Sequence, residues 1–226
     1  MTQSAAPIMS AADYALARNL MVDGQLRPTN VTDRRILDAM RALPRESYVP
    51  SKLAPLAYID QDLPLGAGRV MLKPLLLARL LQLARPRAGE TALIVWAGSL
   101  YGAAVLAACG VHVTALEEDA ALLALAPQAP AQEGTIAVVE GKLADGYEAS
   151  APYDLVVIEG GVPSIPEAIG RQVAAGGRLV AVVMPQGVAG YAAIAEPTTG
   201  GLSSKPAFNA RAPLLPGLAP APGFSF

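Results

Sequence analysis

The stretch that decides the fold reads Leu93-Ile94-Val95-Trp96-Ala97-Gly98-Ser99-Leu100-Tyr101-Gly102-Ala103-Ala104-Val105-Leu106-Ala107. An aliphatic run leads into a turn at Gly98, and a run rich in alanine follows the turn. A short apolar run that ends at a glycine favours a buried strand, and an alanine-rich run favours a helix. The stretch therefore predicts a strand, a tight turn and a helix.

The same alternation continues along the chain. The expected strands are Thr91–Ala97, His112–Leu116, Thr135–Val139, Tyr153–Ile158 and Arg178–Val183. The expected helices between them are Ser99–Cys109, Asp119–Leu125 and Pro166–Ala175. Two further segments, Gly190–Ala195 and Ala207–Leu215, are candidate closing strands. Strands that alternate with crossover helices predict an α/β fold with a parallel sheet covered on both faces.

The residues before this alternation predict a helical extension. Ser10 and Asp13 can cap a first helix that ends before Gly24, and a second helix runs from Thr32 to Pro44. Residues 45–69 are rich in proline and glycine and are expected to form a connector, and a third helix begins at residue 74 with a proline. We divide the chain into an extension with its connector (1–72), an α/β domain (73–216) and a carboxyl-terminal tail (217–226).

The composition excludes several classes of protein. Hydrophobic residues make up 53% of the 226 residues and charged residues 16%, which is typical of a globular protein with a large core. A net charge of -2 without a basic tract argues against nucleic-acid binding. The single cysteine, Cys109, excludes an intrachain disulfide and favours a reducing compartment. The sequence has no secretion pattern and no apolar stretch of about 18 residues, so we expect a cytoplasmic protein without a membrane partner.

Chemistry is expected where parallel strands end, because open α/β sheets bind ligands outside the carboxyl ends of their strands. This rule selects the turns 96–100, 117–119, 141–143 and 159–161. A carboxylate after the second strand can accept two hydrogen bonds from a ribose diol, which makes Glu117 the candidate ribose ligand. The alternative is that Glu117 is a solvated strand end or a helix cap.

Several motifs resemble the protein-L-isoaspartate O-methyltransferase family. The opening stretch is similar to the family's V/L-L-E-I-G-T-G-S-G-Y-x-A-A-V-L-A, most closely in its second half. Residues 39–50, which read A-M-R-A-L-P-R-E-S-Y-V-P, resemble A-M-x-x-V-P-R-E-x-F-V-P and are followed by Ala57-Tyr58. Residues 151–154 and 176–180 match the borders of the fourth and fifth strands. The resemblance extends from about Arg18 to Val183.

This resemblance implies a Rossmann-like methyltransferase sheet of seven strands, the last antiparallel, behind an N-terminal helical extension. It implies S-adenosylmethionine as the cofactor and, as partners, damaged proteins whose isoaspartyl carboxylates are methylated for repair. The cofactor-binding candidates that it implies are Gly98, Ser99, Glu117, Gly141 and Lys142. The substrate-binding candidates are Tyr58, Leu72 and Pro74.

The chain departs from the family at several motif positions. Ile94 replaces an acidic residue, Trp96 replaces the first glycine of the turn and Leu100 replaces the third. An indole at a glycine position takes space that backbone and cofactor normally share, unless it points away and packs beneath a helix. Lys142 replaces an aspartate that accepts a hydrogen bond from adenine, and its charge can instead face solvent or pair with Glu140.

Leu72 replaces a serine whose hydroxyl lies beside the substrate carboxylate, so no catalytic residue is assigned. A carboxylate is already ionised at about pH 7 and needs no general base to accept a methyl group. Losing the serine should therefore matter less than losing the cofactor cradle.

Three hypotheses follow. The first is an S-adenosylmethionine-dependent carboxyl methyltransferase of weak activity, and the second is an inactive scaffold that binds an unknown protein partner. A nicotinamide dinucleotide domain is disfavoured because the first turn lacks G-x-G-x-x-G. His112 and the nearby Cys109 are too few ligands for a metal site. We interpret His112 as a packed histidine at the end of a strand. Glu159 faces the expected cleft, where it either contacts a ligand or ends its strand in solvent.

Overall fold

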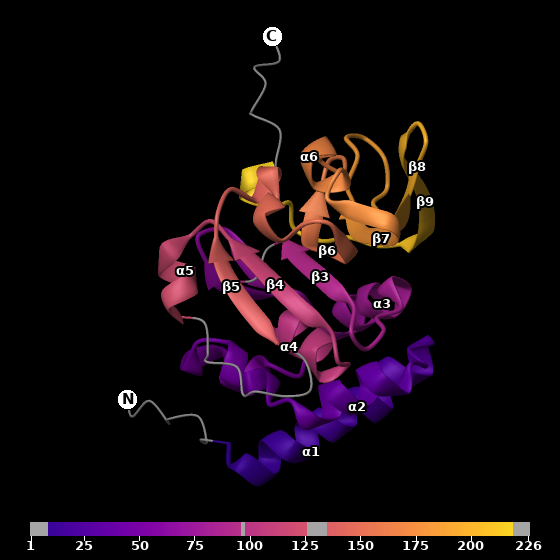
Figure 1. Cartoon of the computed structure of the whole chain (residues 1–226). Coiled ribbons are helices and arrows are strands. Elements are labelled where there is room, and N and C mark those ends of the chain that lie inside the picture. Colours follow the sequence, from indigo (N-terminus) through magenta and orange to yellow (C-terminus); the bar gives the residue numbers. More distant parts are fainter. Residues whose placement is uncertain (1–8, 96–97, 126–134, 219–226) are drawn as a thin grey trace.

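The computed structural model describes residues 9–95, 98–125 and 135–218. Its centre is a seven-stranded sheet in the order β5-β4-β3-β6-β7-β8-β9 (Figure 1). The strands are β3 (Thr91–Val95), β4 (His112–Glu117), β5 (Ile136–Glu140), β6 (Tyr153–Val162), β7 (Val173–Val183), β8 (Tyr191–Thr198) and β9 (Gly201–Asn209). Strands β3 to β7 pair in parallel, whereas β8 pairs antiparallel with both β7 and β9. The expected α/β methyltransferase-like sheet is confirmed.

Helices cover both faces of this sheet. The α-helices are α1 (Ala11–Met21), α2 (Arg34–Ala42), α3 (Pro74–Ala84), α4 (Tyr101–Ala108), α5 (Ala120–Leu125) and α6 (Glu167–Gly170). Residues of α1 to α4 belong to the core on one face, together with Ala92 and Ile94 of β3. Residues of α5 and α6 belong to the core on the other face, together with Leu93 and Val95. Adjacent residues of a strand point to opposite faces, so this strand must be apolar throughout.

None of the described helices is long and apolar enough to cross a lipid bilayer.

Local capping signals place the first helices, with one correction. The Ser10 hydroxyl accepts the Asp13 amide at 3.3 Å and the Asp13 carboxylate accepts the Ser10 amide at 2.8 Å, which confirms the expected cap. The expected cap at Thr32 is wrong. Asp33 caps α2 by accepting the Arg35 amide at 3.0 Å, while the Thr32 hydroxyl donates to the Gln82 side chain at 3.5 Å. Gln82 of α3 therefore engages the hydroxyl that was expected to cap.

The extension and connector hold more structure than expected. Helix α1 does not end the helical path before Gly24, because a π-helical turn, η1 (Val22–Leu26), and a 3-10 turn, η2 (Arg27–Thr29), follow it. The connector contains the 3-10 turns η3 (Arg45–Tyr48) and η4 (Ser51–Leu56). It ends in an antiparallel hairpin, β1 (Leu63–Gly66) and β2 (Arg69–Met71), that the sequence did not predict.

The expected helix Pro166–Ala175 is too long. Helix α6 ends at Gly170 because Gln172, which is buried, joins three segments: its side chain accepts the Tyr147 amide at 2.8 Å and donates to the Asp145 carbonyl at 2.7 Å, and its own carbonyl accepts the Tyr153 amide at 2.8 Å. Strand β7 then starts earlier than expected.

The expected closing strand Ala207–Leu215 is displaced. The first closing strand, expected at Gly190–Ala195, corresponds to β8, but the second is β9, which begins at Gly201 and is mostly exposed. An exposed edge strand is held by pairing with its neighbour more than by burial, so a pattern of apolar residues does not locate it.

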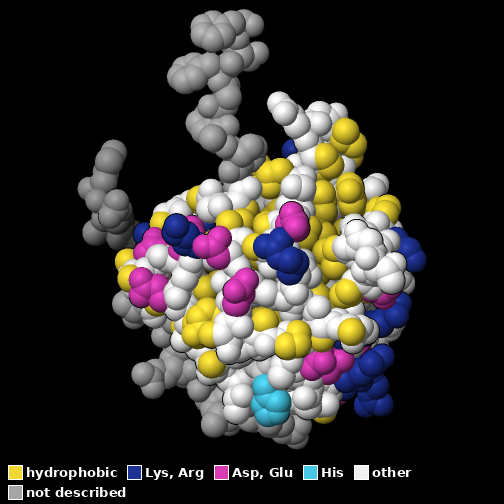
Figure 2. All heavy atoms as spheres, turned by 45° about the horizontal axis from the view of Figure 1, so that its top comes forward, with side chains coloured by type: hydrophobic (Ala, Val, Ile, Leu, Met, Phe, Trp, Pro, Cys, Tyr) yellow, Lys and Arg dark blue, Asp and Glu magenta, His cyan; other side chains and the backbone are white. Residues whose placement is uncertain are grey.

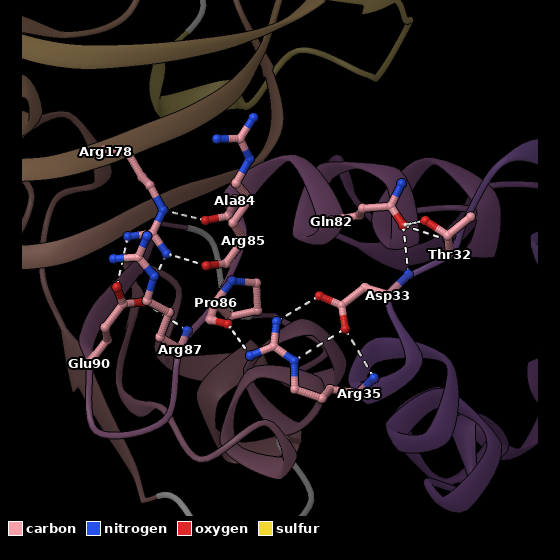
Figure 3. A network of polar contacts seen from close by, with 10 residues as sticks. All are labelled: Thr32, Asp33, Arg35, Gln82, Ala84, Arg85, Pro86, Arg87, Glu90 and Arg178. Atoms are coloured by element: carbon pink, nitrogen blue, oxygen red, sulfur yellow. Dashed lines mark hydrogen bonds and ion pairs between the residues drawn. The ribbon is translucent and has the colours of Figure 1, made fainter.

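Arg178 joins the two halves of the domain at the end of the sheet opposite the expected site (Figure 3). Its guanidinium donates to the Ala84 carbonyl, to the Arg85 carbonyl at 2.6 Å and to the Glu90 carboxylate at 2.8 and 2.9 Å. It thereby ties β7 to the end of α3 and to the turn before β3. Both members of the Arg178–Glu90 pair are largely buried, at 10% and 13% side-chain exposure.

Replacing Arg178 by alanine should lower the free energy of unfolding by about 2 to 4 kcal/mol, because the carboxylate of Glu90 and two carbonyls lose their partner in a buried place. Urea denaturation measures this change. The matched control is Arg171→Ala, which removes an ion pair to Glu167 whose side chains are 63% and 87% exposed and should cost less than about 0.5 kcal/mol. Equal losses in the two variants would contradict a stabilising role for the buried network.

Candidate active site

The topology brings all four selected stretches to one edge. Strands β5, β4, β3 and β6 are neighbours and run parallel, so their carboxyl ends share one edge of the sheet. Residues 159–161, expected to follow the fourth strand, instead belong to β6, which continues to Val162. Figure 2 shows the molecule with the top of Figure 1 turned forward; acidic and basic side chains lie close together there, beside exposed apolar ones. The strand order reverses at β3, where β4 lies on one side and β6 on the other, and this is where ligands of open α/β sheets bind.

The turn after β3 retains part of its expected geometry. Trp96 and Ala97 lie outside the described residues. Gly98 is half-buried, and the buried hydroxyl of Ser99 accepts the Tyr101 amide at 3.3 Å at the start of α4. The turn thus delivers the chain into the first turn of the helix.

Leu100, at the third glycine position of the family motif, keeps a glycine-like backbone. Its φ is +57°, in the left-handed region, which costs a residue with a side chain about 1 to 2 kcal/mol. Its side chain is only 3% exposed, and burying a leucine contributes about 1.5 to 3 kcal/mol. Burial therefore offsets the backbone strain, and the left-handed turn forms without glycine.

Glu117, the candidate ribose ligand, lies at the end of β4 and is fully buried. Its Oε1 accepts the amides of Glu118 and Asp119, both at 2.9 Å, and lies 3.4 Å from the Arg69 guanidinium. Its Oε2 is buried and has no hydrogen-bond partner among the described residues. One oxygen of this carboxylate is therefore held by the fold while the other remains able to accept.

The electrostatics of Glu117 follow from this arrangement. Burial raises the pKa of its carboxyl, and the amide of Asp119 and the charge of Arg69 oppose that rise. Arg69 also donates to Glu118 at 2.8 Å. The guanidinium comes from β2, so the hairpin that was missed in the sequence supplies the cation of this site. No sequence signal distinguishes Arg69 from other arginines.

The turn after β5 distinguishes the two alternatives for Lys142, which were to face solvent or to pair with Glu140. Its side chain is exposed, and it forms no ion pair with Glu140, so it faces solvent. A methyl group built on Gly141 would lie 3.1 Å from Leu116, so backbone and core are close together there. Leu143 is buried, and its amide donates to Glu118 at 3.3 Å.

The three substrate-binding candidates are buried on the face that α3 and α4 cover. Tyr58 donates its hydroxyl to Glu46 and accepts from Arg18 at 3.1 Å. Leu72 is fully buried, and Pro74 begins α3. The fold therefore already engages the Tyr58 hydroxyl, and the substrate role of these three residues stays a prediction.

Glu159 lies on β6 and is buried in the interior. It is 4% exposed, and its carboxyl lies against Gly102 in the first turn of α4, where an added methyl group would meet Oε2 at 2.2 Å. Burial raises the pKa of this carboxyl to about 8, and the charge of Arg45 opposes the rise. The alternative of a solvated strand end is wrong for Glu159, because the helix covers it.

Residues 212–218, which sequence reasoning divided between a closing strand and a tail, lie beside the site. Gly161 donates its amide to the Pro213 carbonyl at 2.8 Å and accepts the Leu215 amide at 2.9 Å. A methyl group on Gly160 would overlap Leu215, and one on Gly217, in the 3-10 turn η7 (Pro216–Leu218), would lie 2.6 Å from the Glu118 carboxylate. The segment 212–218 therefore walls the carboxyl edge from β6 toward β4.

His112 and Cys109 form no metal site. His112 is exposed rather than packed, and its ring nitrogen lies 3.1 Å from the Thr135 hydroxyl. Burial raises the pKa of the Cys109 thiol to about 11. The described part of the chain holds no group of three histidine, cysteine or acidic side chains that could ligate a metal ion.

The fold is methyltransferase-like. A solved protein-L-isoaspartate O-methyltransferase matches it with a TM-score of 0.74 at 20% identity, over 89% of this chain and 67% of the other. A putative protein-L-isoaspartate O-methyltransferase from Plasmodium falciparum, in complex with S-adenosyl-L-homocysteine, matches with a TM-score of 0.71 at 16% identity, over 90% and 98%.

Sequence comparison identifies the family within this class. The family model described as protein-L-isoaspartate(D-aspartate) O-methyltransferase (PCMT) matches residues 17–202. Protein-L-isoaspartate O-methyltransferase of Methylorubrum extorquens is 41% identical over 77% of this chain and 77% of its own length. A relative from Rhodopseudomonas palustris, protein-L-isoaspartate O-methyltransferase 1, is 38% identical over 78% and 72%. The chain belongs to the protein-L-isoaspartate O-methyltransferase family.

The buried carboxyl of Glu159 should make stability depend on pH. Its pKa is about 8 in the folded chain against an ordinary value of 4.5, so the folded state holds a proton that the unfolded state releases between these values. The stabilisation is fully present below about pH 4.5 and is lost as the pH rises toward 8, by an amount on the order of a few kcal/mol. We expect the unfolding free energy of wild type, relative to Glu159→Gln, to fall between pH 5 and 8.

Urea denaturation at several pH values measures this dependence. Glu140→Gln, at an exposed carboxylate that ends β5, is the control and should follow the wild-type profile. A constant difference between wild type and Glu159→Gln across the range would contradict burial of an ionisable carboxyl.

Proposed function

We propose that this chain transfers the methyl group of S-adenosylmethionine to the carboxylate of isoaspartyl residues in proteins. The observation that carries the proposal is the buried Oε2 of Glu117, which has no partner within the described structure at the strand end where a ribose binds in such sheets. Buried polar atoms are nearly always hydrogen-bonded. A ribose hydroxyl would donate to this oxygen, so the residues present fit the nucleoside end of the cofactor.

The residues of the chain position the two reactants, and none of them has to accept a proton during methyl transfer. The bound cofactor supplies a methyl group on a sulfonium, and an ionised acceptor carboxylate can attack it without a base. Alignment of two reactants alone can contribute up to about 7 to 11 kcal/mol to the rate. Ser99 and Leu100 shape the turn above β3, Glu117 would hold the ribose, and Gly141 with Lys142 would border the base.

A groove beside the start of α3 suits an acidic acceptor. It has a volume of about 770 Å³ and runs between α3, the connection after β7 and the end of β9. Lys73, Arg79 and Arg211 line it with one acid, Asp60, whose carboxylate accepts the Leu75 amide at 3.1 Å. An excess of cations raises the local concentration of acidic peptides. Isoaspartyl proteins are therefore the proposed partners. The cytoplasm is the proposed location, in agreement with the single cysteine of the chain.

The second candidate function is an inactive scaffold that binds another protein. Leu72 favours it, because this side chain is buried and brings no hydroxyl to the acceptor side. The exposed Lys142 favours it as well, since a lysine cannot accept from an adenine amino group.

Calorimetric titration with S-adenosylmethionine and S-adenosylhomocysteine separates these functions. We expect binding by wild type, and a loss of about tenfold in Glu117→Gln, because a neutral amide oxygen accepts a weaker hydrogen bond than a carboxylate does. Glu140→Gln should bind like wild type. Methyl transfer to an isoaspartyl peptide should exceed transfer to the same peptide with a normal aspartate.

Dissociation constants in the millimolar range, or no binding, would reject the enzyme and favour the scaffold. The double variant Trp96→Gly, Lys142→Asp should bind the cofactor more tightly, because it restores the space and the acceptor that the family motif provides. An unchanged affinity would show that these two departures do not limit binding.

A further inference from the structure

Two charged groups that the proposed function leaves unused lie near the first turn of α4. They are the guanidinium of Arg45 and the carboxyl of Glu159, and these residues are 0% and 4% exposed. Arg45 Nη1 has no hydrogen-bond partner among the described residues. Glu159 also makes no hydrogen bond or ion pair with any residue that the structure describes. Two unused charged groups in the interior need an explanation.

The fold holds Arg45 firmly but leaves one nitrogen unused. Its Nε donates to the Ala57 carbonyl at 2.7 Å and its Nη2 donates to the Leu72 carbonyl at 2.5 Å. The guanidinium carbon lies 4.8 Å from the centre of the Tyr101 ring. Nη1 is therefore a donor whose direction is set by three contacts.

Glu159 and Arg45 act on each other without touching. The charge of Arg45 lowers the pKa of Glu159, while burial raises it, yet no ion pair within 4.0 Å joins the two side chains. An acid and a cation that served stability alone would be expected to pair in such a place. The unpaired acid and the unpaired cation are both explained if a third group that carries both charges binds to them.

An α-amino acid group has this pattern of charge, because its ammonium and its carboxylate are attached to one carbon. The ammonium has three donors for Glu159, and the carboxylate has acceptors for Arg45 Nη1. S-adenosylmethionine ends in such a group. The chemistry of the two side chains therefore matches the end of the cofactor that Glu117 does not contact.

The sheet sets the right span between the two ends. Glu117 ends β4 and Glu159 lies on β6, with β3 between them, so two strand spacings, about 10 Å, separate these positions. Glu117 continues the alternate positions of β4 that pack beneath α1 to α4, as Ala115 does, and Glu159 lies against Gly102 of α4, so both point to the same face. A ribose on Glu117 and an amino acid on Glu159 would thus lie on either side of the turn 98–100.

We propose that Glu159 and Arg45 bind the amino-acid end of S-adenosylmethionine, with Glu159 accepting from the ammonium and Arg45 Nη1 donating to the carboxylate. This inference rests on the proposed function, because it requires the same cofactor. It assigns to this chain two binding residues that the first turn and Glu117 do not include. The acceptor carboxylate is the competing occupant, and the binding experiment below distinguishes the two.

Binding of two nucleosides tests the assignment. S-adenosylhomocysteine carries the amino-acid end, whereas 5′-methylthioadenosine has the same nucleoside and sulfur without it. We expect Glu159→Gln to bind S-adenosylhomocysteine at least tenfold more weakly than wild type and to bind 5′-methylthioadenosine within about twofold of wild type. Arg45→Lys should show the same selective loss, because its ammonium cannot reproduce the fixed direction of Nη1.

The controls keep the outcomes distinct. Glu140→Gln should leave both affinities unchanged. Equal affinity of wild type and Glu159→Gln for S-adenosylhomocysteine would overturn the inference, and so would an equal loss for both nucleosides, which would indicate a structural defect. If Glu159→Gln bound both nucleosides like wild type but acted less well on an isoaspartyl peptide, the groups would be assigned to the acceptor. If wild type binds neither nucleoside, the proposed function fails, and the inference fails with it.

Proton release gives a second readout. With a pKa of about 8, Glu159 is about nine-tenths protonated at pH 7, and an ammonium beside it would favour its ionised form. The charged group that acts on Glu159 is Arg45 of η3, and its guanidinium keeps its proton between pH 6 and 7. We expect nearly one proton released per S-adenosylhomocysteine and a dissociation constant that falls about tenfold from pH 6 to 7.

Calorimetry in buffers of different ionisation heat measures this release. 5′-Methylthioadenosine should release no proton, and Glu159→Gln should release none with either nucleoside. Release by Glu159→Gln equal to that of wild type would assign the proton to another group and overturn the role of Glu159.

Discussion

The buried guanidinium of Arg45 connects the amino-terminal extension to the sheet. Burying a cation is costly unless hydrogen bonds offset the cost, so the connector brings the carbonyls of Ala57 and Leu72 to two of its nitrogens. The Tyr101 ring on which it lies begins α4, the helix that follows the first turn. The position of the extension, the start of α3 and the start of α4 therefore depend on one side chain, and the candidate site lies where these three meet.

Much of the fold follows from local patterns. The apolar runs of β3, β4 and β6 and the cap at Ser10 depend on residues that are close together in the sequence, so the sequence predicts them well. The strand order places the turns that follow these strands at one edge, as predicted, and it brings Glu117 and Glu159 to the same face. The left-handed turn at Leu100 was harder to expect, since it depends on burial of the leucine side chain rather than on a glycine.

The features that were missed depend on contacts between distant segments. The hairpin β1 and β2 and the edge strand β9 have few buried apolar residues, so only their pairing reveals them. Arg69 and Glu117 are 48 residues apart in the sequence, and the residues around neither of them predict that contact. The stretch that decided the fold also contains Trp96, which lies outside the described residues, so its indole does not enter the account of the turn.

The wall formed by residues 212–218 has a consequence for the order in which the protein acquires its site during translation. All the strands from β3 to β9 precede this segment, so they can leave the ribosome and begin to pair while Gly160 and Gly161 still lack their cover. At about 5 to 20 residues per second, the sheet precedes its wall only briefly. A chain that ended before residue 212 would hold the strands and both carboxylates without this wall.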